Sequence, residues 1–257
     1  NVSGQYSVFS RKEGPRTWRV LDNWFDVKLR VGSKLQILTF DGRTLTNEVT
    51  VLAHEDAGLI TDEERKFMTE EAGLVFELGK ALRRASRLTV DSDVDPGRYA
   101  AIASEGSMCN GFVITNCVFG YSRARGLLLK GSHGEVRDNL IVRTSGPGIS
   151  VSTEYSWLSG GCASDLEITG NTLWWAGDRQ ISVGGDVGFG RKVAAQLQPG
   201  AHHDIRIRNN RLAGRRGILL QGCGDCEVRD NELEIEGSLP VHRLWLQNSD
   251  RIVSDIK

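Results

Sequence analysis

The chain has 257 residues, and its 32 basic and 33 acidic side chains leave a formal net charge of −1. A charge so close to zero predicts no general attraction to nucleic acid or to an anionic membrane surface. The longest apolar runs fall far short of the ~20 residues that a membrane-spanning helix needs, so no membrane span is predicted.

The first 97 residues carry no internal repeat and predict a small antiparallel unit. Apolar and polar residues alternate from Val27 to Val31 and again after a turn at residues 32–34. Residues 46–55 then supply a further strand. Short alternating strands joined by tight turns favour a small β-barrel or sheet. We expect this barrel-like unit, residues 1–97, to be inserted into the fold of the remaining chain or to lie beside it.

A short helix is predicted inside the barrel-like unit. Thr61 and Glu64 have the spacing of a capping box, in which two side chains satisfy free backbone amides at a helix start. The helix should run for about three turns and end near Gly73. Residues 74–78 and 86–90 are then typical of strands that lead to the second half of the chain.

Residues 98–257 carry a repeat in which a short alternating strand runs into an asparagine. Repeats of roughly 20–50 residues, built from short strands without a helix between them, predict a solenoid. The fold class is therefore expected to be all-β, a right-handed parallel β-helix with the barrel near its N-terminus. The asparagines should stack at one turn, amide to amide between strands ~4.8 Å apart, without a catalytic role. They are Asn116, Asn139, Asn171, Asn210 and Asn231.

Two of the repeats are longer than the others because extra residues follow their second strand. These excursions are residues 152–164 and 184–203. Since they leave adjacent repeats at the same point, we expect them to project on one side and to wall a groove. Insertions of this kind in solenoids usually mark the binding face.

The excursions and the turn between them hold the candidate catalytic residues. Glu154, Tyr155 and Trp157 lie in the first excursion, Asp186 lies in the second, and Asp178 precedes the strand between them. Carboxylates beside aromatic rings suit a sugar site, because a pair of carboxylates can serve as acid and base in glycoside hydrolysis. The same residues also fit structural roles, in which Trp157 pins its own loop, Glu154 is solvated and Asp178 makes a turn.

Two arginines, Arg123 and Arg125, stand just before an inward strand. They are suited either to clamp a substrate or to pair with Glu135 or Asp138 of the next repeat.

The five cysteines do not have the spacing of a disulfide scaffold or of a metal site. Cys223 and Cys226 form a single CxxC pair without a second ligand pair, so packed thiols are favoured over zinc. The chain also lacks a nucleophile elbow, a P-loop and a dinucleotide fingerprint. No metal and no organic cofactor are therefore predicted.

The run from Arg123 to Leu173 resembles the β-helix glycosidases of the α-1,3-galactosidase type, glycoside hydrolase family 110. It shares the order of an R-x-R-G strand, an asparagine-ended strand, a loop with tryptophan and small residues, and a further asparagine-ended strand. Residues 31–45 are similar to the barrel segment of that family. In the opening NVSGQY, Asn1 and Tyr6 match a family phrase whose histidine is replaced here by Ser3.

The resemblance implies an enzyme that cleaves a terminal α-galactoside with inversion, using two carboxyls roughly 6.5–9.5 Å apart and no cofactor. It implies an oligosaccharide or glycan as substrate and a secreted or periplasmic parent protein. Within the chain, the candidate catalytic residues remain Glu154, Asp178 and Asp186, which its own residue pattern suggests. The substrate contacts that the resemblance implies are Asn1, Tyr6, Arg123, Arg125, Tyr155 and Trp157.

The two ends of the chain predict that it is an internal fragment. In the family an acidic pair implicated in catalysis precedes the phrase that opens this chain at Asn1. That pair is therefore expected upstream, and the chain is expected to lack part of the catalytic site. At the other end, residues 251–257 are expected to begin a new repeat, with Ile252 in register with Val228. The family also has a glutamate after the loop tryptophan, where this chain has Leu158 and Ser159.

Two rival functions remain open. A glycan-binding solenoid without catalysis is expected if no carboxylate pair lines the groove. A β-helix polysaccharide lyase would need a basic residue, and Arg191 and Lys192 are the residues that suggest one. The sequence carries no indication of the oligomeric state.

Overall fold

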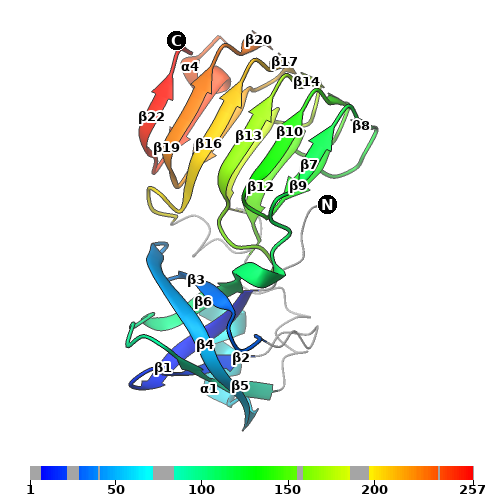
Figure 1. Cartoon of the computed structure of the whole chain (residues 1–257). Coiled ribbons are helices and arrows are strands. Elements are labelled where there is room, and N and C mark those ends of the chain that lie inside the picture. Colours follow the sequence, from blue (N-terminus) through cyan, green and yellow to red (C-terminus); the bar gives the residue numbers. More distant parts are fainter. Residues whose placement is uncertain are drawn as a thin grey trace.

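The computed structural model describes residues 7–21, 29–39, 41–71, 84–154, 159–185, 197–236 and 238–256. Two kinds of β-structure make up the molecule (Figure 1). The N-terminal part is a closed antiparallel barrel, and the rest is built from three parallel sheets. The fold is therefore all-β with parallel sheets, as the sequence predicted.

The barrel closes six strands in the order β1-β2-β5-β4-β3-β6. The strands are β1 (Ser7–Gly14), β2 (Thr17–Leu21), β3 (Lys34–Leu38), β4 (Thr44–Leu59), β5 (Arg84–Val90) and β6 (Arg98–Ser104). Trp18, Ile37, Leu88 and Ile102 are fully buried in its core. Because β6 pairs with both β1 and β3, the barrel extends to Ser104 and not to residue 97 as predicted.

The predicted capping box is present at the start of α1 (Asp62–Lys66). The backbone N–H of Glu64 donates to Thr61 Oγ1 at 3.1 Å, and the N–H of Thr61 donates to Glu64 Oε2 at 2.7 Å. The chain continues in a wider π-type turn, η1 (Phe67–Glu71). The predicted helix end near Gly73 and the strand at residues 74–78 lie outside the described residues.

Glu64 also anchors the helix to the barrel wall. Its carboxylate is fully buried and accepts hydrogen bonds from Arg19, with 2.6 Å between Arg19 Nε and Oε1. Burial acts to raise the pKa of Glu64, but hydrogen bonds from Arg19 and Thr61 outweigh it and hold the pKa below its usual value.

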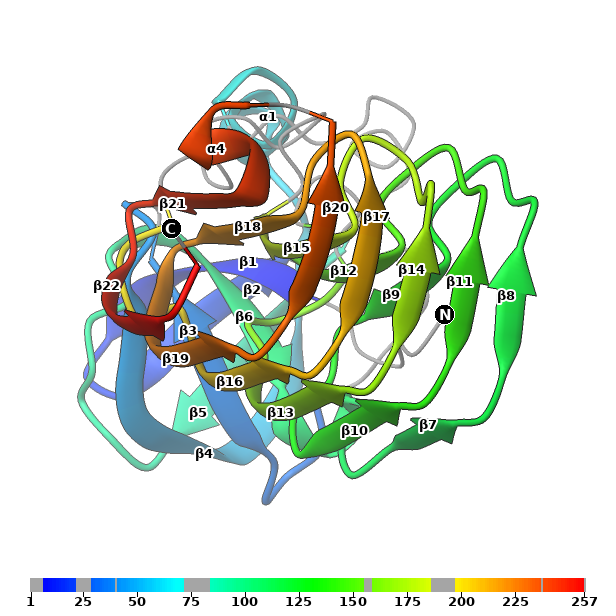
Figure 2. The same cartoon turned by 90° about the horizontal axis from the view of Figure 1, so that it is seen from above.

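Successive strands of the second half fall into three parallel sheets in turn (Figure 2). The β7 sheet contains β7 (Val113–Thr115), β10 (Gly134–Arg137), β13 (Ser164–Thr169), β16 (His202–Arg208), β19 (Cys223–Arg229) and β22 (Asp250–Ser254). The β8 sheet contains β8 (Val118–Gly120), β11 (Leu140–Val142), β14 (Thr172–Trp174), β17 (Arg211–Gly214) and β20 (Glu232–Ile235). The β9 sheet contains β9 (Leu127–Leu129), β12 (Ile149–Thr153), β15 (Ile181–Gly185), β18 (Ile218–Gln221) and β21 (Leu244–Gln247). We call three consecutive strands, one from each sheet, a rung.

The space between the three sheets is filled by the apolar positions of the repeat. Val136, Ile168, Ile207 and Val228 are buried and occupy matching positions of neighbouring strands in the β7 sheet. No rung can bury these side chains alone, so stacking of the rungs supplies the core. The short helices η2 (Glu105–Ser107) and α4 (Pro240–Arg243) complete the described elements. None of the helices within the described ranges is long and apolar enough to span a bilayer.

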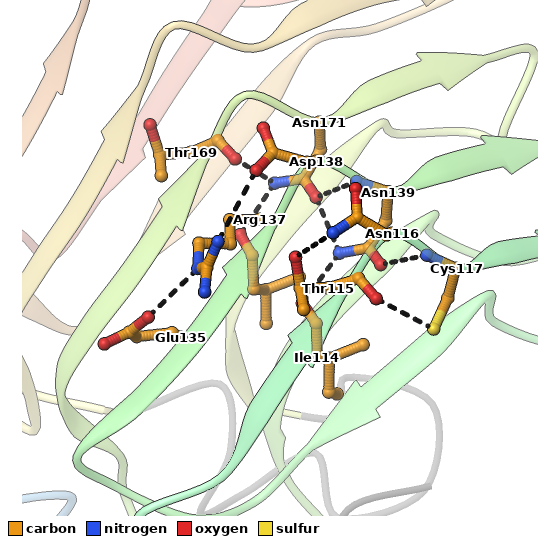
Figure 3. A network of polar contacts seen from close by, with 11 residues as sticks. Ile114, Thr115, Asn116, Cys117, Glu135, Arg137, Asp138, Asn139, Thr169 and Asn171 are labelled. Atoms are coloured by element: carbon orange, nitrogen blue, oxygen red, sulfur yellow. Dashed lines mark hydrogen bonds and ion pairs between the residues drawn. The ribbon is translucent and has the colours of Figure 1, made fainter.

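Four of the five predicted asparagines form the expected ladder. The Nδ2 of Asn139 donates to Asn171 Oδ1 at 2.9 Å, and Asn171 donates in the same way to Asn210 Oδ1 at 3.0 Å. Asn210 then donates to Asn231 Oδ1 at 2.9 Å. Figure 3 shows the first part of this ladder. The asparagines therefore satisfy one another and the backbone at a single turn, which is the structural role predicted for them.

Asn116 is not part of the ladder, so that prediction was wrong by one residue. Asn116 has a φ of 54° and matches Asp138, whose φ is 57°, at the left-handed position of the turn. The ladder position in this rung is Cys117, whose N–H donates to Asn139 Oδ1 at 3.0 Å. Asparagine tolerates the left-handed conformation, which accounts for its presence here without a ladder contact.

The last strand is also displaced from its predicted register. Ile252 pairs with Cys226 rather than with Val228. A new rung nevertheless begins at these residues, as predicted, because β22 is the next strand of the β7 sheet.

The barrel contacts the parallel sheets through the ends of the two excursions. The side-chain amide of Gln36 in β3 accepts from the N–H of Cys162 at 2.6 Å and donates to its carbonyl at 2.9 Å. On the other excursion, the N–H of Gln198 donates to the carbonyl of Gly42 at 2.9 Å. An apolar cluster completes this contact, and it contains Leu38, Ala101, Cys162, Leu197 and Ala201.

Candidate functional site

The two excursions leave the β9 sheet side by side. Thr153, the last residue of β12, pairs in register with Gly185, the last residue of β15. The chain returns from them in another pair of neighbours, because Ser164 of β13 pairs with His203 of β16. The predicted common origin of the excursions is therefore correct.

A buried histidine, His202, ties the two excursions together. Its Nδ1 accepts the N–H of Ala163, at the end of the first excursion, at 3.0 Å. Its Nε2 lies 3.0 Å from the carbonyl oxygen of Gly184, at the start of the second, and so donates to it. Burial lowers the pKa of His202 to about 4, against smaller opposite effects of these two backbone contacts. The sequence suggested neither bond, because both partners are distant along the chain.

Glu154, at the start of the first excursion, is the centre of a buried ion-pair cluster. Its Oε1 lies 2.7 Å from Arg125 Nη2, and its Oε2 accepts a hydrogen bond from Lys130 Nζ. Lys130 also donates to Ser159 Oγ at 2.7 Å. We call these four residues the Glu154 cluster. Glu154 is 7% exposed and Lys130 only 2%. The structural alternative considered for the sequence, in which the Glu154 carboxylate is solvated, is therefore wrong.

The Glu154 cluster closes the base of the first excursion. The N–H of Glu154 donates to the carbonyl of Ser159 at 2.8 Å, and the reverse bond is 3.1 Å long. Gly160 follows with a φ of +90°, and a side chain there would lie 2.9 Å from Lys130 Cδ. The close approach of the lysine stem thus requires glycine at this position. The cluster therefore joins Glu154 and Ser159 to each other and to Lys130.

Arg125 has a different partner from the ones considered in the sequence. It contacts Glu154 of the following rung instead of Glu135 or Asp138. Arg123 is exposed.

Asp178 belongs to a separate group of charges at the opposite ends of the strands. Its Oδ2 lies 3.3 Å from Arg216 Nη1, and its side chain is 62% exposed. Asp178 precedes β15, whereas Glu154 follows β12, and a five-residue strand extends about 16 Å at ~3.3 Å per residue. The contacts described for Asp178 and for Glu154 are therefore separate, and none of them joins the two carboxylates.

Next to Asp178, Arg179 is almost completely buried. It is 7% exposed, its guanidinium carbon lies 4.6 Å from the centre of the Trp245 ring, and its Nη1 has no hydrogen-bond partner within the described part of the chain. Burial lowers the pKa of Arg179, while the Asp178 carboxylate acts to raise it. The aromatic face replaces part of the hydration that the cation loses.

Several predicted site residues lie outside the described residues. These are Asn1, Tyr6, Tyr155, Trp157 and Asp186. The lyase candidates Arg191 and Lys192 are outside them as well. Asp186 follows Gly185 in the sequence, and Gly185 pairs with the residue that precedes Glu154.

The outer face of the β9 sheet carries polar and apolar side chains, because Leu128 and Leu219 stand in register with Ser150 and Ser182. Ser150 and Ser152 alternate along β12 with the inward Ile149 and Val151, and both are nearly inaccessible. Gln221, at the end of β18, is 1% exposed. Together with the Glu154 cluster, these side chains line the sheet face from which the excursions leave.

All five cysteines are free thiols, and three of them are buried. Cys162, Cys223 and Cys226 are buried, in agreement with the prediction of packed thiols, whereas Cys109 and Cys117 are exposed. Burial raises the pKa of Cys223 well above its usual value. No group of three or more histidine, cysteine, aspartate and glutamate residues within the described ranges is arranged to hold a metal ion.

Comparisons with known proteins place the chain in no family. No family model matches it, and no curated protein matches it either. Among solved structures, the tailspike protein gp49 from Pseudomonas phage LKA1 matches with a TM-score of 0.30 and 12% sequence identity. The match covers 90% of this chain and 38% of the tailspike chain.

Proposed function

We propose that the three parallel sheets form a right-handed parallel β-helix and that the protein is carbohydrate-active, with its glycan lying on the outer face of the β9 sheet. The observation that carries the proposal is the register of Thr153 with Gly185, which starts both excursions at one edge of that face. Insertions that leave neighbouring repeats at one point are typical of binding faces in solenoids.

The polar side chains where the excursions leave this face support a glycan as ligand. Sugar hydroxyls need donors and acceptors held in fixed positions, and hydrogen-bonded side chains are held in this way. Lys130 donates to Glu154 and Ser159, and Gln221 Oε1 accepts from the N–H of Gly185 at 3.4 Å. Tyr155 and Trp157, in the sequence between Glu154 and Ser159, would add aromatic surface for a sugar ring.

The reaction we propose is hydrolysis of a terminal α-galactoside with inversion, in a secreted or periplasmic protein. It needs one carboxylic acid and one carboxylate, roughly 6.5–9.5 Å apart, with a water between the base and the sugar. Glu154 and Asp186 are the best pair to test, because each directly follows one of two neighbouring strands. Asp178 is the weaker candidate, since it lies at the other ends of the strands.

Glycan binding without catalysis is the second candidate. It is favoured by the contacts of the described carboxylates, because both oxygens of Glu154 meet cations and Asp178 meets Arg216. A carboxylate that is paired with cations in this way holds a loop in place, and this role requires no catalysis.

Hydrolysis and binding are separated by measuring both with a panel of α-linked galactosides. We expect binding at the β9 sheet, and turnover whose product anomer, followed by NMR, is inverted. Glu154→Gln and Asp186→Asn should each reduce kcat about 10²–10⁴-fold if the residue is the acid or base, with binding retained. Glu135→Gln is the matched control, because Glu135 is an exposed glutamate on the β7 sheet.

Three outcomes decide between the candidates. Loss of turnover with intact binding and an unchanged melting temperature supports the catalytic role. Binding without turnover by the unsubstituted chain supports the non-catalytic candidate. If no glycan binds and none is cleaved, the proposed function is wrong.

A further inference from the structure

A groove of about 230 Å³ lies on the outer face of the β8 sheet, away from the β9 sheet that carries the Glu154 cluster. Figure 2 shows strands β14, β17 and β20 of this sheet side by side. The groove is lined by Leu140, Thr172, Trp174, Arg211, Ala213 and Glu234.

The groove exists because a small residue stands between two large ones. Trp174, Ala213 and Glu234 are register partners on β14, β17 and β20, so their side chains form one row on the outer face. Two rung spacings of ~4.8 Å separate the tryptophan from the glutamate, or roughly 9.5 Å between their backbones. Ala213 offers only a methyl group and leaves this interval open.

The walls of the groove combine an aromatic platform with a balanced ion pair. Trp174 is 51% exposed, and the outer face of its ring is not needed for the core. Arg211 Nη2 lies 3.0 Å from Glu234 Oε1. This pair presents both donors and acceptors to the groove, and Glu232, 3.9 Å from Arg211 Nε, leaves the site without excess positive charge. The lining therefore favours a neutral, hydroxyl-rich ligand over an anion.

Trp174 and Trp175 are neighbours in the sequence and both are exposed. Adjacent residues of a regular strand point to opposite faces, so one of the two would point inward if the strand continued. Both are exposed, because Trp175 has a φ of 53° and lies at the turn where the strand alternation ends.

We propose that this groove binds one neutral hexopyranose residue of a glycan, with the apolar face of the sugar on Trp174 and its hydroxyls on Arg211 and Glu234. The volume is slightly below the roughly 300–1,000 Å³ of pockets that enclose drug-sized ligands, which suits a single sugar unit with the remaining chain outside. The proposal does not rest on the proposed function, because it uses another sheet and no residue of the Glu154 cluster.

The test is titration of the full chain with methyl α-galactoside, methyl α-glucoside and a neutral galacto-oligosaccharide, observed by NMR of the tryptophan indole N–H signals and by calorimetry. Trp174→Ala should weaken binding tenfold or more at this site. Ala213→Phe fills the groove and should have the same effect while keeping Trp174. Trp175→Asn is the matched control, because it removes the neighbouring exposed tryptophan with a residue that tolerates the left-handed turn.

The outcomes separate this inference from the proposed function. Glu154→Gln should leave sugar binding at the groove within twofold, whatever it does to turnover. Equal binding by Trp174→Ala and the unsubstituted chain, with both folded, would overturn the groove assignment alone. Concentration-dependent self-association that Trp174→Ala abolishes, without sugar binding, would show that the face instead contacts a second copy.

Discussion

The asparagine ladder can be tested at two neighbouring residues, Asn210 and Asn209, whose environments are opposite. Asn210 is 1% exposed, and its Oδ1 accepts from both the backbone N–H and the Nδ2 of Asn171 at 3.0 Å. Its own Nδ2 donates to Ile168, to Arg208 and to the next asparagine. Asn209 is exposed and occupies the left-handed turn position with a φ of 54°.

Asn210→Ala leaves the buried backbone N–H of Asn171 without its acceptor, whereas Asn171 Nδ2 keeps the carbonyls of Val136 and Thr169. At about 1–3 kcal/mol for an orphaned buried group, the free energy of unfolding should fall by about 1–3 kcal/mol. For a chain of this size a loss of ~2 kcal/mol corresponds to a fall in melting temperature of about 4–8 °C. Asn209→Gly keeps a residue that adopts positive φ freely, so its effect should stay within about 0.5 kcal/mol.

The assay is urea unfolding followed by circular dichroism, together with amide hydrogen exchange at Asn171. We expect faster exchange of the Asn171 amide only in Asn210→Ala. Equal losses of stability for the two variants would contradict the reasoning, because they would show that burial of the ladder does not decide its contribution.

Further predictions concern buried charged and titratable groups. Folding lowers the pKa of His202 from about 6.5 to about 4. Between pH 6.5 and 4 the imidazole is therefore protonated in the unfolded chain but neutral in the folded one. The free energy of unfolding should consequently decrease as the pH falls through this range. The loss should approach about 3 kcal/mol, and urea unfolding of His202→Gln over the same range should lack this component. Arg19→Met removes the hydrogen-bonded cation of the fully buried Glu64 carboxylate and leaves, among the described cations, only Arg11, 3.5 Å away, so it should cost about 3 kcal/mol in thermal unfolding. Arg179→Met removes a buried cation whose Nη1 has no partner in the described chain, so it should cost less than ~1 kcal/mol; a cost equal to that of Arg19→Met would contradict this account.

Local features were predictable wherever neighbours in the sequence are also neighbours in space. The capping box of Thr61 and Glu64 is one such case, because the two groups it joins lie three residues apart. The strands that end at Asn139, Asn171 and Asn210 are another, since the alternation of their side chains is visible in a few residues. Their common turn followed from the repetition of the pattern.

Register could not be predicted in this way. Asn116 and Asn139 end similar sequence motifs, but they do not occupy equivalent positions of the turn. The pairing of β7 with β10 shows that Asn139 corresponds to Cys117 and that Asn116 corresponds to Asp138. A shift of one residue exchanges the two faces of a strand, so a motif alone cannot locate it. The end of the barrel at Ser104 is a similar case, because β6 becomes part of the barrel through its two partners.

The amino-acid sequence by itself determined the class of structure, the two excursions and their origin in neighbouring repeats, because periodic burial and turn chemistry act over a few residues. Only the tertiary structure decided what the candidate residues contact. It gave Glu154 two cations from an earlier rung, tied the excursions together through His202 and left a groove beside Trp174. These contacts depend on register and on burial, which arise when distant segments stack and which no single segment carries.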